Sequence, residues 1–130
     1  PASIYHKFFR ALNGETKMSK RDPMSVLTLS DDPELAKKKV RNCVDGGRKT
    51  AEEQRRLGGE PEKCVNYELA MFHFVEDDNH LKRIYEECKT GKRLCGECKK
   101  EVAEIVAKFL KEHQKRKEKM LPKARKILKV

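Results

Sequence analysis

The chain has 130 residues, of which 40% are charged and 6% are aromatic, with no Trp. This composition favours long solvated helices over a β-sandwich or barrel, and the length allows one domain plus part of another. The formal net charge of +10 is concentrated at the end, because residues 91–130 contain fourteen Lys or Arg against five Asp or Glu. Such a local excess predicts either a polyanion partner such as RNA or a solvated tail.

Hydropathy and cysteine usage indicate the compartment. No apolar run approaches the roughly 20 residues that a membrane-spanning helix needs, and the opening residues do not have a signal-peptide pattern. We therefore expect a cytoplasmic protein without a membrane partner. In that compartment the five cysteines are expected to be thiols or metal ligands, not disulfides.

Residues 1–30 predict little helix. The apolar segment "SIYHKFF" leads to the turn signal "NGET", a polar loop that ends at Pro23, and the short β-branched run "SVLTLS". This opening does not contain the elements that would bury its own apolar face. We expect it to be the last piece of a larger domain.

From residue 31 onward the pattern becomes helical. Pro33 follows an Asp cap, Thr50 and Glu53 have the spacing of a capping box, and glycines end several segments. In the last segment apolar residues recur every three or four positions, so one face belongs to a core. The sequence thus predicts a mostly α fold, a compact bundle whose lysine-rich end lies on the surface or frays. The expected helices are residues 31–47, 50–58, 65–76, 77–91 and 96–120.

The segment "KMSKR", Lys17–Arg21, sits between a glycine turn and "DP". It resembles the KMSKS loop of class I aminoacyl-tRNA synthetases. A mobile loop with ammonium groups can bring positive charge to a leaving pyrophosphate in a transition state. The resemblance implies that Lys17 and Lys20 are catalytic and that the loop, with Met18, Ser19 and Arg21, binds ATP. Arg21 stands where the family often has Ser.

Longer segments resemble the tryptophanyl-tRNA synthetases of the archaeal and eukaryotic type, above all "GGRKTAEEQRRLGG" and "FVEDDNHLKRIYEECKTGKRLCGECKKE". The resemblance implies a helical anticodon-binding domain over residues 31–130, after a short remnant of a Rossmann-type catalytic domain over 1–30. The parent reaction is ATP-dependent charging of tRNA-Trp with tryptophan by a homodimer. This chain alone is then expected to be an inactive monomer that still binds tRNA weakly.

The same resemblance assigns anticodon contacts to Arg48, Lys49 and Lys99. Arginine can stack on an unpaired base and hydrogen-bond to its edge, which suits splayed loop bases of RNA. Lys49 departs from relatives that have an acidic residue there, and lysine cannot accept a hydrogen bond from an exocyclic amine. The simpler alternative is that Arg48 and Lys49 are exposed residues at a helix start, and that Lys99 and Lys100 lie on a solvated face.

Four cysteines have the spacing C-x23-C-x6-C-x2-C: Cys64, Cys88, Cys95 and Cys98. Some tryptophanyl-tRNA synthetases of thermophilic bacteria have nearly this spacing and bind a four-iron four-sulfur cluster. The resemblance implies a structural cluster here that positions the anticodon residues. Four thiols also suit zinc, although zinc sites usually pair short-spaced ligands twice, and unligated thiols are the third possibility. Cys43 is expected to be a core thiol and His73 a core histidine.

Two other functions remain open from the residues alone. One is a stand-alone iron–sulfur or zinc module of helical fold, for electron transfer or regulation. The other is a general basic RNA-binding protein. Neither needs the "KMSKR" loop, so this segment favours the synthetase.

Overall fold

The computed structural model describes residues 2–5 and 7–129, and these residues form helices and connecting segments without a β-strand. The prediction of a mostly α fold is confirmed. Short 3-10 turns at Pro23–Ser25 and Pro61–Lys63 and a π-helical turn at Ala70–Phe74 complete the secondary structure. The α-helices are α1 (Pro33–Arg41), α2 (Ala51–Leu57), α3 (Val65–Leu69), α4 (Asp78–Lys89) and α5 (Cys95–Leu128).

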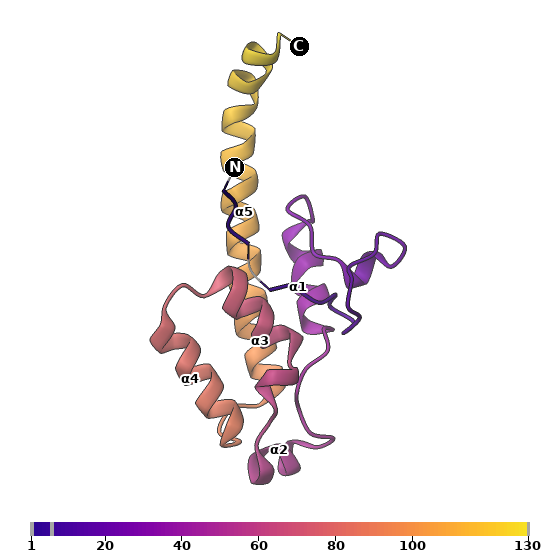
Figure 1. Cartoon of the computed structure of the whole chain (residues 1–130), viewed down its shortest axis with the longest axis vertical. Coiled ribbons are helices and arrows are strands. Elements are labelled where there is room, and N and C mark those ends of the chain that lie inside the picture. The colour runs from indigo at the N-terminus through magenta and orange to yellow at the C-terminus, as the bar shows by residue number, and fades with distance from the viewer. Residues whose placement is uncertain (1, 6, 130) are drawn as a thin grey trace.

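Helix α5 is the axis of the fold, and Figure 1 shows the other helices gathered around its first half. The long sides of α1 and α5 pack together, and α3 with the turn that follows it covers another side of α5. The side chains between them form one apolar cluster, so the predicted core face of this helix is confirmed. Cys43 belongs to this cluster, as predicted for a core thiol, whereas the prediction of a core histidine is wrong, because His73 is exposed. The buried members of the apolar cluster that belong to α5 are Val102, Ala103, Val106 and Leu110.

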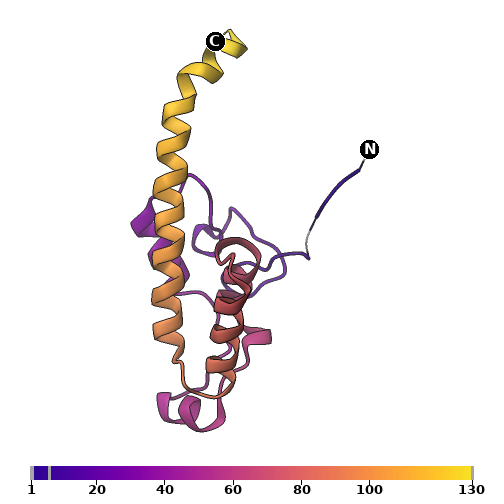
Figure 2. The ribbon, with the colours of Figure 1, turned by 90° about the vertical axis from the view of Figure 1, so that its left-hand side faces the viewer.

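The first thirty residues are tied to the rest of the chain at several places, among them Arg10, Leu12 and Val26. Leu12 is buried in the apolar cluster, its N–H donates to the carbonyl of Ser25, and its own carbonyl accepts from the N–H of Val44. Residues 2–5 lead away from the body, and Ile4 and Tyr5 are exposed (Figure 2). The boundary at residue 30 stays a prediction.

Two of the five expected helices begin and end close to their predicted bounds. The hydroxyl of Thr50 accepts from the N–H of Glu53 at the start of α2, and the carboxylate of Asp77 accepts from the N–H of Asn79 at the start of α4. These side chains satisfy backbone donors that a helix start leaves unpaired. Local capping therefore decides both starts.

The other three helices differ from the expectation. Helix α1 ends at Arg41 instead of continuing to the glycines, because the chain turns there and the N–H of Val44 donates to the carbonyl of Leu12. The expected helix over 65–76 changes to a π-helical turn after Leu69. Helix α5 continues to Leu128, past the expected end at residue 120, because Pro122 lies on an exposed stretch and removes only one backbone donor.

Helix α5 is anchored to the rest of the chain up to Gln114. The side-chain amide of Gln114 donates to the carbonyls of Leu29 and Asp31, at 3.2 and 2.8 Å. Beyond it the helix stands clear of the body (Figures 1 and 2). Although α5 has 34 residues, neither it nor any other helix among the described residues is apolar enough to span a bilayer.

Candidate functional site

The "KMSKR" loop, Lys17–Arg21, is a short surface turn. The hydroxyl of Ser19 accepts from the N–H of Arg21 at 3.3 Å, and the carbonyl of Ser19 accepts from the N–H of Asp22. Lys17, Lys20 and Arg21 are exposed, and none of them forms an ion pair with another described residue. Met18 instead points toward an apolar hollow of about 340 Å³ that Phe109 also lines. The loop thus presents three cations that are unpaired among the described residues, on a backbone held by short local bonds.

Arg48 lies just before α2 and its guanidinium is partly held. Its Nε donates to the carbonyl of Gly58 at 2.8 Å, and a terminal nitrogen lies 3.6 Å from a carboxylate oxygen of Glu60. The backbone N–H of Arg48 donates to the side-chain oxygen of Gln54, which is buried within α2. The side chain is still 33% exposed. The second terminal nitrogen has no partner among the described residues and remains available to a ligand, while the two contacts fix the direction of the guanidinium.

Arg48 and Lys49 border an open hollow of about 460 Å³ between the start of α2 and the start of α5. Lys49 is exposed at its rim. Most other lining residues belong to two short segments, one on each side of the hollow. They are Asp45, Gly47, Thr50, Ala51, Gln54, Leu94, Cys95, Gly96 and Glu97.

Lys99 does not project freely as Lys49 does. Its ammonium lies 2.6 Å from a carboxylate oxygen of Asp45, and the lysine side chain is 16% exposed. The other oxygen of Asp45 accepts from the N–H of Gly47 at 2.9 Å. Sequence reasoning missed Asp45, because no local signal pairs an acid in a loop with a lysine more than fifty residues later. The pair fastens the loop before Arg48 to the first turns of α5.

The ion pair also sets the charge states of both groups. Burial raises the pKa of Asp45, but the hydrogen bonds from Lys99 and from the N–H of Gly47 outweigh burial and hold that pKa below its ordinary value. Burial lowers the pKa of Lys99, and its bond to Asp45 raises it above the ordinary value. Both groups are therefore charged at neutral pH, and the contact persists there.

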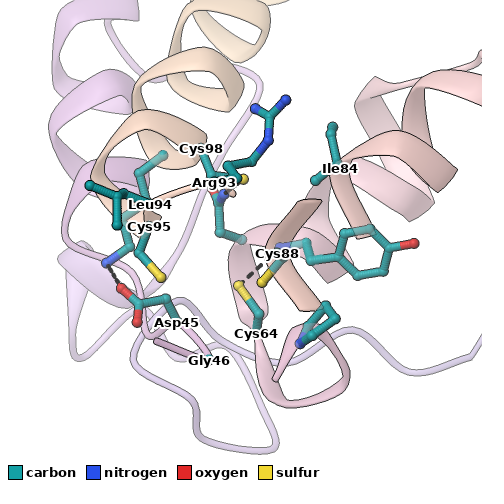
Figure 3. Close-up of a pocket in the computed structure, with 13 residues that line it drawn as sticks. Asp45, Gly46, Cys64, Ile84, Cys88, Arg93, Leu94, Cys95 and Cys98 are labelled. Atoms are coloured by element: carbon teal, nitrogen blue, oxygen red, sulfur yellow. Dashed lines mark hydrogen bonds and ion pairs between the residues drawn. The ribbon is translucent and has the colours of Figure 1, made fainter. Parts of the chain in front are cut away.

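The four cysteines of the spacing motif line one cavity, which Figure 3 shows between the start of α3, the end of α4 and the start of α5. Cys64 precedes α3, and its sulfur accepts from the N–H of Tyr67 at 3.4 Å. Cys88 is near the end of α4, and Cys95 begins α5. The sulfur of Cys98 accepts from the side-chain amide of Asn66 at 3.4 Å. The convergence expected from the spacing is present.

The metal itself finds no such support. Among residues 2–5 and 7–129, no group of three or more His, Cys, Asp or Glu side chains is arranged to hold a metal ion. The cavity has a volume of about 20 Å³, which is room for about one water. Burial raises the pKa of the Cys95 and Cys98 thiols to about 12. In this arrangement both are protonated at neutral pH and are poor nucleophiles.

Two glycines make room for the cysteine side chains. A Cβ at Gly47 would lie 2.6 Å from the sulfur of Cys95, and a Cβ at Gly59 would lie 2.7 Å from the sulfur of Cys88. Real carbon atoms do not approach sulfur so closely, so larger residues at either position would displace the thiols. The loop with Arg48 and the cysteine cavity therefore share one wall.

Comparison with known proteins places this arrangement in a family. The family model described as class I tRNA synthetases (W and Y) matches residues 1–111. The chain belongs to the family of class I tryptophanyl- and tyrosyl-tRNA synthetases. Among relatives, the tryptophan–tRNA ligase of Archaeoglobus fulgidus is 52% identical over 118 residues, which is 91% of this chain and 28% of that protein. That of Hyperthermus butylicus is 50% identical over 89% of this chain and 31% of its own length.

Solved structures agree with the family. The crystal structure of tryptophanyl-tRNA synthetase from Aeropyrum pernix K1 matches 88% of this chain and 31% of its own, with a TM-score of 0.84 and 50% identity. The tryptophanyl-tRNA synthetase from Giardia lamblia matches 87% of this chain and 28% of its own, with a TM-score of 0.81 and 38% identity. The chain thus spans less than a third of the relatives that it matches.

The family match decides between the alternatives left open by the residues. A stand-alone iron–sulfur or zinc module and a general basic RNA-binding protein both lose their support, because one synthetase family model extends from residue 1 to residue 111. The resemblance to the tryptophanyl members is confirmed. The roles of individual residues are a separate matter.

Proposed function

We propose that this chain is the tRNA-binding helical part of a tryptophan–tRNA ligase and that it recognises the anticodon of tRNA-Trp. The relatives carry the name tryptophan–tRNA ligase, which supplies the substrate class. The observation that carries the proposal is the open hollow beside Arg48, whose guanidinium is held at two nitrogens and whose third nitrogen has no partner among the described residues. Such a side chain can stack on a splayed base or bond to its edge.

The three predicted RNA-binding residues take different parts in this proposal. Arg48 contacts a base, and Lys49 at the rim contacts phosphate, since it is exposed and can only donate. Lys99 acts through Asp45, because their ion pair holds the loop that presents Arg48. Its part is therefore to position Arg48 and not to read a base.

The "KMSKR" loop serves the parent reaction, in which ATP activates tryptophan before transfer to tRNA. Lys17 and Lys20 would stabilise negative charge on the leaving pyrophosphate, and both are exposed without an ion pair to another described residue. Met18, Ser19 and Arg21 would complete the ATP-binding loop. We propose that the reaction needs the remaining two thirds of the relatives' length, which also forms the parent homodimer. The 130-residue chain alone is then an inactive monomer.

Substitution of Arg48 tests the anticodon contact. Arg48→Gln is expected to weaken binding of a tRNA-Trp transcript about tenfold or more and to reduce discrimination against a transcript with an altered anticodon. Arg48→Lys retains the charge but not the planar fork, so it should lose discrimination as well. Fluorescence anisotropy with both transcripts at one fixed salt concentration measures the two effects.

Arg56→Gln is the matched control for this experiment. Arg56 lies on α2 and is exposed, and its replacement by Gln removes the same charge as Arg48→Gln. It should weaken both transcripts slightly and equally. Equal discrimination in wild-type chain and Arg48→Gln, with both folded by circular dichroism, would contradict the role of Arg48.

A second proposal concerns the cavity of Cys64, Cys88, Cys95 and Cys98. Four thiols line one cavity, and four cysteine thiolates are the usual ligand set of a four-iron four-sulfur cluster. The cysteines would hold the cluster as thiolates, and their present cavity of about 20 Å³ would have to widen. A bound cluster would supply a rigid link between the ends of α4 and α5, without a redox role.

Absorption of anaerobically purified chain tests this proposal. A visible band bleached by dithionite, with equal iron and sulfide, is expected for the wild-type chain and for Cys43→Ala, because Cys43 lies in the apolar core. Cys95→Ser should lose most of the band. A colourless protein with one equivalent of zinc, or one without metal, would contradict the cluster and leave the anticodon proposal standing.

A further inference from the structure

The last half of α5 is the most strongly charged part of the molecule. We call residues 115–129 the α5 tail. It extends beyond Gln114, the last α5 residue whose side chain hydrogen-bonds to the body, and it stands clear in Figures 1 and 2. All its residues are exposed. The match to the family model ends at residue 111, before the tail.

The tail contains eight basic residues and one acid, a net charge of +7. None of these eight side chains forms an ion pair with a carboxylate among the described residues. In the body, by contrast, lysines and arginines close to acids are paired, as in Lys37 with Glu104 and Arg93 with Glu101. Ion pairs among the described residues therefore leave the charge of the tail uncompensated. Its basic residues are Lys115, Arg116, Lys117, Lys119, Lys123, Arg125, Lys126 and Lys129.

We propose that the α5 tail binds the phosphate backbone of the same tRNA whose anticodon lies at the hollow beside Arg48. This inference rests on the proposed function and adds a second, sequence-independent contact to it. Cys95 lines the hollow. At about 1.5 Å of helix per residue, Lys123 lies roughly 40 Å from Cys95 along α5. A tRNA contacted at the anticodon is long enough to reach both places, and a row of cations spaced along it displaces condensed counterions.

The shape of the tail favours RNA over a lipid surface. Met120, Leu121, Ile127 and Leu128 do share one face, and all four are exposed. That face is short, because Lys117 lies one turn before Leu121 on it. No aromatic residue follows Phe109, whereas helices that lie in a membrane interface usually anchor with Trp or Phe. The basic residues extend along more of the tail than the apolar residues do. Binding of a polyanion requires only the basic residues.

Salt-dependent tRNA binding tests the inference on the 130-residue chain. The tail variant combines Lys123→Gln, Lys126→Gln and Lys129→Gln, which lie on consecutive turns. Removing three phosphate contacts should lower the magnitude of the slope of log affinity against log salt by about 2 to 3, and the affinity about tenfold near 100 mM salt. The loss should be the same for tRNA-Trp and for the altered-anticodon transcript, since phosphate contacts do not read sequence.

Two matched variants make the test specific. The body variant combines Lys38→Gln, Arg83→Gln and Lys108→Gln, three exposed cations outside the tail, and it should retain most of the wild-type slope. Replacing the same three tail lysines by Arg should restore the slope. An unchanged slope in the tail variant, or an equal loss in the body variant, would overturn the inference while leaving anticodon discrimination intact.

Two other outcomes are distinguishable. If the wild-type chain binds neither transcript, the proposed function fails and the inference fails with it. If the wild-type chain binds vesicles of phosphatidylcholine with 30% phosphatidylserine more tightly than tRNA at the same salt, and Leu121→Gln with Ile127→Gln abolishes that binding, the tail serves a membrane and the inference is overturned. We expect vesicle binding to be weaker than tRNA binding and insensitive to these apolar substitutions.

Discussion

Gly58→Ala is expected to lower the free energy of unfolding by about 3 kcal/mol. Gly58 has φ of +71°, which costs an L-residue roughly 1–2 kcal/mol. In addition, a Cβ there would lie 1.8 Å from the carbonyl oxygen of Lys89, so the ends of α2 and α4 would have to separate. Urea unfolding followed by circular dichroism measures the change.

Gly96→Ala is the matched control, because a Cβ at Gly96 meets no heavy atom within 4 Å. Gly96 lies in the first turn of α5, where Ala is the better helix former, so this variant should be as stable as wild type or more stable by up to about 1 kcal/mol. If the free energy of unfolding of Gly58→Ala lies within about 0.5 kcal/mol of the wild-type value, the close contact between the end of α2 and the end of α4 is contradicted. Because the Gly58 carbonyl accepts from Arg48, this variant should also lose anticodon discrimination.

Asp31→Asn is expected to destabilise the chain by a similar amount, about 3 kcal/mol, by leaving a buried ammonium without its counter-charge. The Lys39 ammonium lies 2.7 Å from the Asp31 carboxylate and 2.8 Å from the carbonyl of Val26, and the lysine side chain is only 4% exposed. The double variant Lys39→Met with Asp31→Asn removes the buried charge as well, so it should recover most of the lost stability. Glu34→Gln removes an exposed carboxylate whose partner Lys37 keeps its ion pair with Glu104, so it should leave the unfolding midpoint nearly unchanged.

The effect of Asp31 should depend on pH. Burial raises its pKa, but hydrogen bonds from Lys39 and Thr28 outweigh burial, and the pKa lies below its ordinary value of 3.8. The stabilisation is therefore complete above pH 4 and is lost as pH falls through the lowered pKa, because the unfolded chain takes up the proton first. Unfolding curves at pH 7 and pH 3 should show the difference between wild type and Asp31→Asn shrink. A constant difference would mean that the carboxylate charge does not matter.

Local signals in the sequence predicted the parts of the fold that depend on neighbouring residues. The caps Thr50 and Asp77 fix the starts of α2 and α4 by bonds within three residues. The apolar spacing of α5 fixes its buried face, and the four cysteines that the spacing motif grouped line one cavity. Each of these needs no knowledge of distant contacts.

The rest depends on contacts between distant segments. Asp45 pairs with Lys99 only because the loop before α2 crosses the start of α5, and the π-helical turn after Leu69 lets Ala70 and Phe74 reach the core beside Phe109. The sequence predicts too short an α5, because a proline inside a helix, such as Pro122, usually kinks or ends it. Tertiary context decides these features, and sequence patterns do not record it.

These contacts also relate the parts of the site to one another. The ion pair from Asp45 to Lys99 attaches the segment before α2 to α5, and the bond from Arg48 to Gly58 attaches it to the end of α2. The next residue, Gly59, donates its N–H to the carbonyl of Cys88 in α4. The cysteine cavity lies against the same segment through Gly47 and Gly59. A change at the cavity should therefore alter how Arg48 is presented, without any cysteine contacting RNA.

The central claim is that the helical part of this synthetase chain recognises the anticodon by itself. The most direct measurement is the affinity of the wild-type 130-residue chain for a tRNA-Trp transcript and for the same transcript with its anticodon replaced, by anisotropy at matched salt. We predict that replacement weakens binding at least tenfold, in line with about 1–3 kcal/mol for the loss of a base-specific contact. Equal affinities would contradict the claim and would reduce the chain's RNA binding to charge alone.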